Sequence, residues 1–323
     1  MSSTAILLLA HGTPNRLSEM SDYLQHVTGG RPLPPHVITE LQHRYAEIGL
    51  REDPLPDGPP LTRWTLRQAE LLEKLIGLKV YVGMRNWHPF IADTVAQMKA
   101  DGVTHAKVLC LAPQNSRTST GLYRRALEAA VAGAFTYDFI AGWADEPLLA
   151  EAFAERLRPV LVQAHGAPVL FTAHSVPCRT IRATSADEAA KSAEPVPAEG
   201  IQDYGTASEG DPYPVECKQT AAAVAKLAGL NDGQWYFAFQ SQGIAGAPWI
   251  GPTVEDTLKA LAEEGHKAVV IQPIGFLCDH VEILYDIDIN FREVARELNM
   301  TVYRPESLND SPALIRALAH VLA

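Results

Sequence analysis

Carboxylate and imidazole side chains gather in one stretch, VVIQPIGFLCDHVEILYDIDIN, which spans Val269–Asn290. Asp279, Glu282 and Asp286 recur there at steps of three and four residues, and His280 follows the first of them. On a helix this spacing stacks the carboxylates on one face, where like charges oppose helix formation. Carboxylate and imidazole together bind iron, zinc or nickel, and both groups accept protons. The stretch therefore predicts a metal site or proton path, although Asp279 by itself fits a helix N-cap.

A histidine follows a second apolar strand, in the segment VLFTAHSVP that contains His174. The beginning of the chain, LLAHGTP, repeats a strand followed by Ala-His-x-x-Pro and presents His11 in the same way. This repeat predicts two related α/β halves. Because the loops at the carboxyl ends of parallel strands open on one edge, we expect His174 and Glu282 to face one cleft. Arg85 and Tyr123, each after its own strand, are expected there with His11.

Helices and strands alternate along the chain and must position these side chains. Strand 5–10 is continuously apolar, as in a parallel sheet covered on both faces. A segment rich in Gly and Pro, 15–60, follows with one expected helix at 36–48. The rest predicts helices at 61–76, 89–100, 119–132, 147–164, 215–228, 253–264 and 311–322, and strands at 79–82, 106–111, 135–141, 169–174, 235–239, 269–273 and 300–303. This alternation is typical of an α/β fold.

Composition excludes several classes of protein. The formal charge of −11 on 323 residues makes nucleic acid a poor partner. No apolar run approaches the roughly 20 residues needed to cross a bilayer, and the start Met-Ser-Ser-Thr lacks the basic region of a signal peptide. We therefore expect a cytoplasmic protein without a transmembrane segment. The four cysteines form no Cys-x-x-Cys pair and indicate neither a disulfide framework nor a zinc ribbon.

Several separated segments resemble the signature sequences of the ferrochelatases. They are FTAHSVP around His174, DPYP at 211–214, QSQ at 240–242 with Pro-Trp at 248–249, PIGFLCDHVEILYD at 273–286 and YVGMRNWHP at 81–89. The resemblance implies two Rossmann-like, doubly wound domains around a porphyrin cleft, and the insertion of Fe2+ into a porphyrin to make a haem. We expect these domains at 1–145, with a porphyrin-binding loop at about 11–60, and at 146–305, with a poorly ordered insertion at about 178–210. A closing helix is expected at 306–323.

The resemblance also implies roles for individual residues. His174, Glu282 and Asp286 match the catalytic positions of the family, with His174 and Glu282 as metal contacts. Fe2+ is then a substrate, and no tightly bound cofactor is expected. No cysteine-bearing tail follows Pro305, so we expect no [2Fe-2S] cluster. Asn290 stands where many relatives carry a third carboxylate.

The choice of porphyrin rests on charge. Coproporphyrin III carries four propionates and is slightly favoured over protoporphyrin IX, because Arg31, Arg44 and Arg85 lie in loops or strand ends expected around the cleft. For Arg31 and Arg44 an ordinary solvated position is the alternative. We expect further polar contacts to the substrate from His11, Tyr45 and Tyr123. Apolar contacts to the flat ring are expected from Leu17, Met20 and Trp249.

Two other functions remain open on the sequence. A sirohydrochlorin or cobalt chelatase would use a pair of histidines with a glutamate, which His11, His174 and Glu282 could supply. A non-catalytic carrier of tetrapyrrole or metal would not need the carboxylates, because it exports no protons. For a ferrochelatase we expect a monomer, with transient contacts to other enzymes of haem synthesis.

Overall fold

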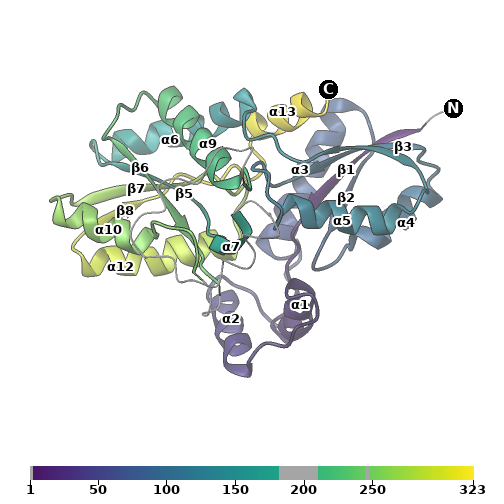
Figure 1. Cartoon of the computed structure of the whole chain (residues 1–323), viewed down its shortest axis with the longest axis horizontal. Coiled ribbons are helices and arrows are strands. Elements are labelled where there is room, and N and C mark those ends of the chain that lie inside the picture. The colour runs from purple at the N-terminus through teal and green to yellow at the C-terminus, as the bar shows by residue number, and fades with distance from the viewer. Residues whose placement is uncertain (1–2, 182–209, 244–247) are drawn as a thin grey trace.

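Two α/β lobes, each built on a four-stranded parallel sheet, make up the computed structural model, which describes residues 3–181, 210–243 and 248–323 (Figure 1). In the first sheet the order is β2 (Val80–Met84), β1 (Thr4–Ala10), β3 (His105–Cys110), β4 (Thr136–Ile140). In the second it is β6 (Trp235–Gln240), β5 (Val169–His174), β7 (Ala268–Pro273), β8 (Thr301–Tyr303). Strands β1 and β5 thus hold equivalent places, and the predicted α/β fold with two similar halves is confirmed.

Helices join successive strands of each lobe, and α6 joins β4 of the first lobe to β5 of the second. The first lobe has α3 (Pro60–Ile76), α4 (Ile91–Ala100) and α5 (Thr120–Val131), and the second has α6 (Pro147–Gln163), α9 (Tyr213–Ala228), α10 (Val254–Glu263) and α12 (Arg292–Glu297). Most of the predicted helices and strands are present, with ends that differ by a few residues. The insertion expected at about 178–210 lies mostly outside the described residues, and only its start is described, as α7 (Cys178–Ile181).

A pair of helices, α1 (Met20–Val27) and α2 (Pro35–Glu47), projects below the two lobes (Figure 1). The prediction of one helix in this segment was wrong, because the eight-residue α1 is too short to show a clear apolar period. Its apolar side packs into a small core with Tyr45 and Trp87. Met20, expected beside the porphyrin ring, is completely buried in that core.

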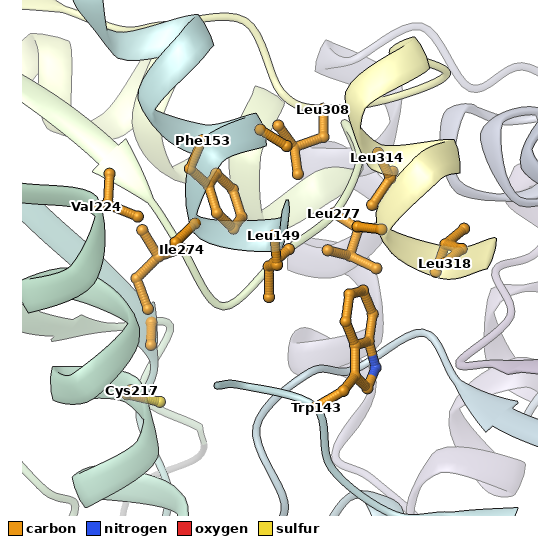
Figure 2. Packing of buried hydrophobic residues seen from close by; sticks show 14 of the residues in the cluster. Trp143, Leu149, Phe153, Cys217, Val224, Ile274, Leu277, Leu308, Leu314 and Leu318 are labelled. Carbon is orange, nitrogen blue, oxygen red and sulfur yellow. The ribbon is translucent and has the colours of Figure 1, made fainter. Parts of the chain in front are cut away.

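The largest hydrophobic core joins the two lobes. It includes Leu8 of β1 and Phe171 of β5, together with α13 (Pro312–Val321), which packs against α3 and α6. Figure 2 shows Leu314 and Leu318 of α13 beside Leu277 and Trp143, which come from loops that follow strands of different lobes. Burial of each such side chain contributes about 1.5–3 kcal/mol. A cavity between the lobes therefore has walls that are held by one shared core.

Candidate active site

The ends of β5 and β7 bring His174 and Glu282 together. His174 is the last residue of β5, and Glu282 lies in the one-turn helix α11 (Val281–Leu284) that follows β7. His174 Nε2 is 3.2 Å from Glu282 Oε1. The connection runs so close to β5 that a Cβ on Gly275 would lie 3.0 Å from the Cβ of Ala173, which explains the glycine. The expected juxtaposition of His174 and Glu282 is therefore present.

This pair is ionised at neutral pH. Burial lowers the pKa of His174, but the adjacent Glu282 carboxylate outweighs it and raises the pKa to about 9. Burial raises the pKa of Glu282, but His174 and then His280 hold it well below its usual value. Both ring nitrogens of His174 also face acceptor oxygens, on Glu282 and on the Ser175 carbonyl. Only the imidazolium can donate to both.

Both the backbone and the carboxylate of Glu282 have polar partners. Gln240, at the end of β6, donates from Nε2 to the Glu282 carbonyl oxygen over 2.6 Å, and its own Oε1 accepts from the Thr172 hydroxyl at 2.7 Å. His280 Nε2 lies 3.4 Å from the second carboxylate oxygen of Glu282, and its Nδ1 donates to the Cys278 carbonyl. These contacts leave the Glu282 carboxylate few other orientations.

Asp286 stands behind this pair. It begins a π-helix, Asp286–Phe291, is only 8% exposed, and accepts a hydrogen bond from the Ser241 hydroxyl. Burial raises its pKa, the Ser241 hydrogen bond lowers it and the charge of Glu282 raises it, with a net value of about 6. A carboxylate with this pKa can take up and release a proton near neutral pH.

Asp279 does not share a face with the other two carboxylates, so the prediction of a three-carboxylate stripe was wrong. The α-helix begins only at Val281, with His280 as N-cap, and changes to a π-helix at Asp286. The Asp279 side chain instead accepts hydrogen bonds from Ser307 and Asn309. An i, i+3, i+4 face requires one continuous α-helix, which is absent here.

A cavity of about 380 Å³ lies between the two lobes, and most of the predicted site residues line it. It is lined by residues of both lobes, including His11, Tyr45, Arg85, Tyr123, His174, Trp249 and Glu282. Arg44 lies beside it, paired with Glu40 and 3.9 Å from Asp286. Arg31 is exposed and donates to the Thr28 carbonyl, so the structure does not place it in the cavity wall.

His11 differs from His174 in its charge. Burial, and then the charge of Arg85, lower its pKa to about 4, so its imidazole is neutral. Asn86 donates to Nε2 over 2.9 Å, and Nδ1 donates to the Gly12 carbonyl. Gly12 has φ +85° and lies against the backbone of Trp87, where a Cβ would clash at 2.8 Å. His11 and His174, which both line the cavity, therefore differ in charge.

Arg85 contributes a guanidinium to the cavity wall. Its guanidinium lies 5.9 Å from the centroid of the Tyr123 ring, and its Nε is buried without a hydrogen-bond partner. Within the described parts of the chain it forms no ion pair, and no other Arg or Lys lines the cavity. The guanidinium is half-buried, and its Nε can donate to a ligand carboxylate without first losing a protein partner.

The expected metal site has two protein ligands at most. Among the described residues, no group of three or more His, Cys, Asp and Glu side chains lies close enough to hold a metal ion. His174 and Glu282 alone do not form a closed structural site, which needs about four ligands. This arrangement suits a metal that passes through as substrate. No helix in the described chain is long and apolar enough to span a membrane.

Three contacting residues were not identified from the sequence. Tyr213 donates its hydroxyl to the His174 carbonyl, Asn86 holds His11, and Gln240 holds Glu282. All three lie in the segments DPYP, YVGMRNWHP and QSQ, which carry the family resemblance. Their residue types alone gave no indication of which group each one contacts.

The charge of His174 leads to a prediction for NMR. We expect its ring protons to titrate near pH 9, and to titrate well below that value in the Glu282→Gln variant, where the anion is removed. Since the pKa in the folded chain exceeds the ordinary 6.5, the contribution of His174 to stability is fully present below pH 6.5 and is lost as the pH rises through 9, whereas that of Glu282, whose pKa is lowered, is lost only in acid. A His174 resonance that titrates below pH 7 in the unmodified protein would contradict the ion pair.

Comparison with known proteins assigns the family. The ferrochelatase family model matches residues 3–323. A ferrochelatase from Acidobacterium capsulatum is 55% identical over 98% of this chain and 93% of that protein, and a coproporphyrin III ferrochelatase from Geobacillus kaustophilus is 32% identical over 99% and 95%. The structure of SirB from Bacillus subtilis with Fe3+ is similar in fold, with a TM-score of 0.53 at 12% identity, over 99% of this chain and 94% of SirB. The chain belongs to the ferrochelatase family, and it is an enzyme that inserts iron into a porphyrin.

Proposed function

We propose that His174, Glu282 and Asp286 carry out the proton transfers of iron insertion in the cavity between the lobes. The overall reaction converts Fe2+ and a free-base porphyrin into a haem and two protons. A base must therefore accept each pyrrole N–H proton, and a path must remove it. The observation that carries the proposal is the His174–Glu282 ion pair in the cavity wall, with Asp286 nearby at a pKa of about 6.

Iron itself makes His174 available as a base. In the resting site His174 is protonated, because Glu282 raises its pKa. An incoming Fe2+ that contacts Glu282 neutralises that carboxylate and adds positive charge, and both effects lower the pKa of His174. The imidazole then loses its proton toward Asp286 and can accept one from the porphyrin. His11 is neutral, but Asn86 occupies its Nε2 and its Nδ1 donates to the Gly12 carbonyl, so it is not needed as a base or as a metal ligand here.

Coproporphyrin III is the porphyrin that the charges favour. Arg85 lines the cavity beside α5, whereas Arg44 lies outside the cavity lining, over the Tyr285 ring next to the π-helix, where a propionate that projects from the cavity can approach it. The four propionates of coproporphyrin III are spread around the macrocycle and can contact both arginines. The two propionates of protoporphyrin IX lie on one edge and cannot. The hydroxyls of Ser116, Ser119 and Tyr123 also line the cavity on the Arg85 side. The coproporphyrin III ferrochelatase of Geobacillus kaustophilus is consistent with this proposal.

Replacing Arg85 tests this substrate. We expect Arg85→Met to lower kcat/KM for coproporphyrin III about tenfold or more, because a hydrogen bond to a charged group contributes about 1.5–3 kcal/mol. The loss for protoporphyrin IX should be smaller. Steady-state insertion of Fe2+ under anaerobic conditions, followed by the Soret and Q bands at several salt concentrations, measures both. In the unmodified enzyme the preference for coproporphyrin III should weaken as salt rises.

Arg124 provides the matched control. Its guanidinium also lies over an aromatic ring, 4.7 Å from the centroid of Phe139, but it does not line the cavity. Arg124→Met should keep both kcat/KM values. A higher kcat/KM for protoporphyrin IX at low salt, unchanged in Arg85→Met, would overturn the choice of coproporphyrin III.

A further inference from the structure

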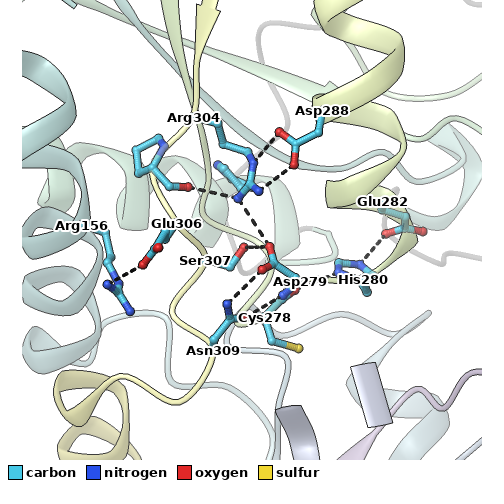
Figure 3. Close-up of polar contacts among 12 residues, drawn as sticks. Arg156, Cys278, Asp279, His280, Glu282, Asp288, Arg304, Glu306, Ser307 and Asn309 are labelled. Atoms are coloured by element: carbon cyan, nitrogen blue, oxygen red, sulfur yellow. Dashed lines mark hydrogen bonds and ion pairs between the residues drawn. The ribbon is translucent and has the colours of Figure 1, made fainter. Parts of the chain in front are cut away.

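A network of polar side chains outside the cavity surrounds Arg304, which follows β8 (Figure 3). The Arg304 guanidinium donates from Nε and Nη2 to both carboxylate oxygens of Asp288, over 2.8 and 2.7 Å. Its Nη1 lies 3.4 Å from Asp279 Oδ1. The side chain is only 12% exposed, so these contacts are shielded from water and are stronger than surface ion pairs.

Asp279 and Asp288 are the two ends of the segment that carries Glu282 and Asp286. One guanidinium thus holds both ends of this segment. The Asp279 end is fixed further by the Ser307 hydroxyl at 2.7 Å and by Asn309, which donates to its carboxylate at 2.9 Å and accepts from its backbone N–H at 2.8 Å. Figure 3 shows Arg304 near both aspartates, with the His280–Glu282 contact in the segment that they bound.

The segment needs such support because its backbone is irregular. It contains a single α-helical turn and then a π-helix, in which the Asn290 N–H donates to the Tyr285 carbonyl. π-Helical turns are rare and are found mostly at functional sites. Glu282 and Asp286 also repel each other across that turn. An anchor behind the segment counters both effects without occupying the cavity.

Residues 304–310, which include Arg304, Ser307 and Asn309, also contact the first lobe. The Asn309 carbonyl accepts from Gln68 Nε2 of α3 over 2.7 Å, and Gln68 is a buried residue of the cavity wall. Asp310 lies 3.5 Å from Arg67 on the same helix. Residues 304–310 therefore connect the Glu282 segment to the opposite wall of the cavity.

We propose that Arg304 is a positioning residue for metal insertion, whose single guanidinium clamps Asp279 and Asp288 and thereby holds Glu282 and Asp286 in place at the cavity. This inference rests on the proposed function of those two carboxylates. Arg304 touches neither of them and does not line the cavity, so it acts on the reaction through the backbone of the segment. An arginine is required, because a lysine ammonium cannot make the bidentate contact and reach a second carboxylate.

The test compares Arg304→Met and Arg304→Lys in the full-length enzyme. We expect Arg304→Met to lower kcat for iron insertion about tenfold or more, since displacement of a catalytic group by about 1 Å can cost up to about a hundredfold. The KM for porphyrin should stay within about twofold. Arg304→Lys should recover only part of kcat. Hydrogen–deuterium exchange should become faster for the amides of 281–291 and stay unchanged in α10.

Arg292 is the matched control, because it pairs with the same carboxylate of Asp288 at 3.5 Å but is 50% exposed. Arg292→Met should keep kcat and the exchange rates. If Arg304→Met does not fold, Asp288→Asn releases one end of the clamp and should show the same loss of kcat at constant KM, to a smaller extent. An unchanged kcat in either variant, or equal losses in kcat and porphyrin affinity, overturns the positioning role. If Glu282→Gln proves active, the proposed function fails. Hydrogen–deuterium exchange at 281–291 in Arg304→Met still shows whether Arg304 holds the segment in place.

Discussion

His174→Ala is expected to abolish iron insertion while the enzyme still binds porphyrin. The variant removes the imidazole that accepts the pyrrole protons, and loss of a general base typically costs about 10²–10⁴-fold in rate. The cavity wall is otherwise retained, since residues of both lobes line it. Porphyrin affinity, measured by quenching of its fluorescence, should therefore change by less than about tenfold, the effect of one or two ordinary contacts. kcat is measured anaerobically with Fe2+.

His105 provides the control for this substitution. It forms a histidine–carboxylate pair with the same separation, 3.2 Å from Nε2 to Asp138 Oδ2, at the start of β3 and away from the cavity. His105→Ala should leave kcat unchanged. Turnover near the normal rate in His174→Ala would remove His174 from the mechanism, whereas parallel losses in both variants would indicate a general effect on folding.

Glu282→Gln is expected to slow turnover nearly as strongly, and Asp286→Asn much less. Glu282 contacts His174 directly and sets its charge, so the amide removes both the anion that Fe2+ meets and the partner of the imidazole. The expected loss is again about 10²–10⁴-fold. Asp286 is one step further along the proton path, where Ser241 and water can substitute in part, and we expect a loss of about tenfold.

The order of these two effects is the informative result. Glu264→Gln is the matched control, because Glu264 faces a surface histidine, His266, at 3.8 Å and lies outside the cavity. It should retain full activity. Equal and small losses in Glu282→Gln and Asp286→Asn would show that the two carboxylates form an ordinary acidic surface, and they would end the proposed proton path.

Local patterns in the sequence determined the architecture. Apolar runs that alternate between strand and helix periods predicted nearly every element of the two lobes, because those periods depend only on neighbouring residues. The Ala-His-x-x-Pro repeat placed His11 and His174 on equivalent strands, and β1 and β5 do hold equivalent places in their sheets. Since parallel strands end on one edge, the facing of His174 and Glu282 followed from topology alone.

Contacts between distant segments decided the rest. The α-helical face expected for Asp279, Glu282 and Asp286 depends on a backbone that the Arg304 clamp and the π-helix change, and Arg304 approaches only in the folded chain. The short α1 exists because a small core receives its apolar side. Which arginine enters the cavity wall also could not be read from residue type, because Arg31 and Arg85 differ only in their surroundings.

The charge states of His11 and His174 were likewise decided by tertiary contacts and not by the local sequence. Both follow an apolar strand and an alanine, so the sequence treats them alike. In the fold, Arg85 and burial keep His11 neutral, whereas Glu282 keeps His174 charged. A pKa depends on the charges and solvent within a few ångströms, and tertiary structure alone sets those. The sequence thus brought both histidines to the cavity, and the folded structure decided which of them holds a proton there.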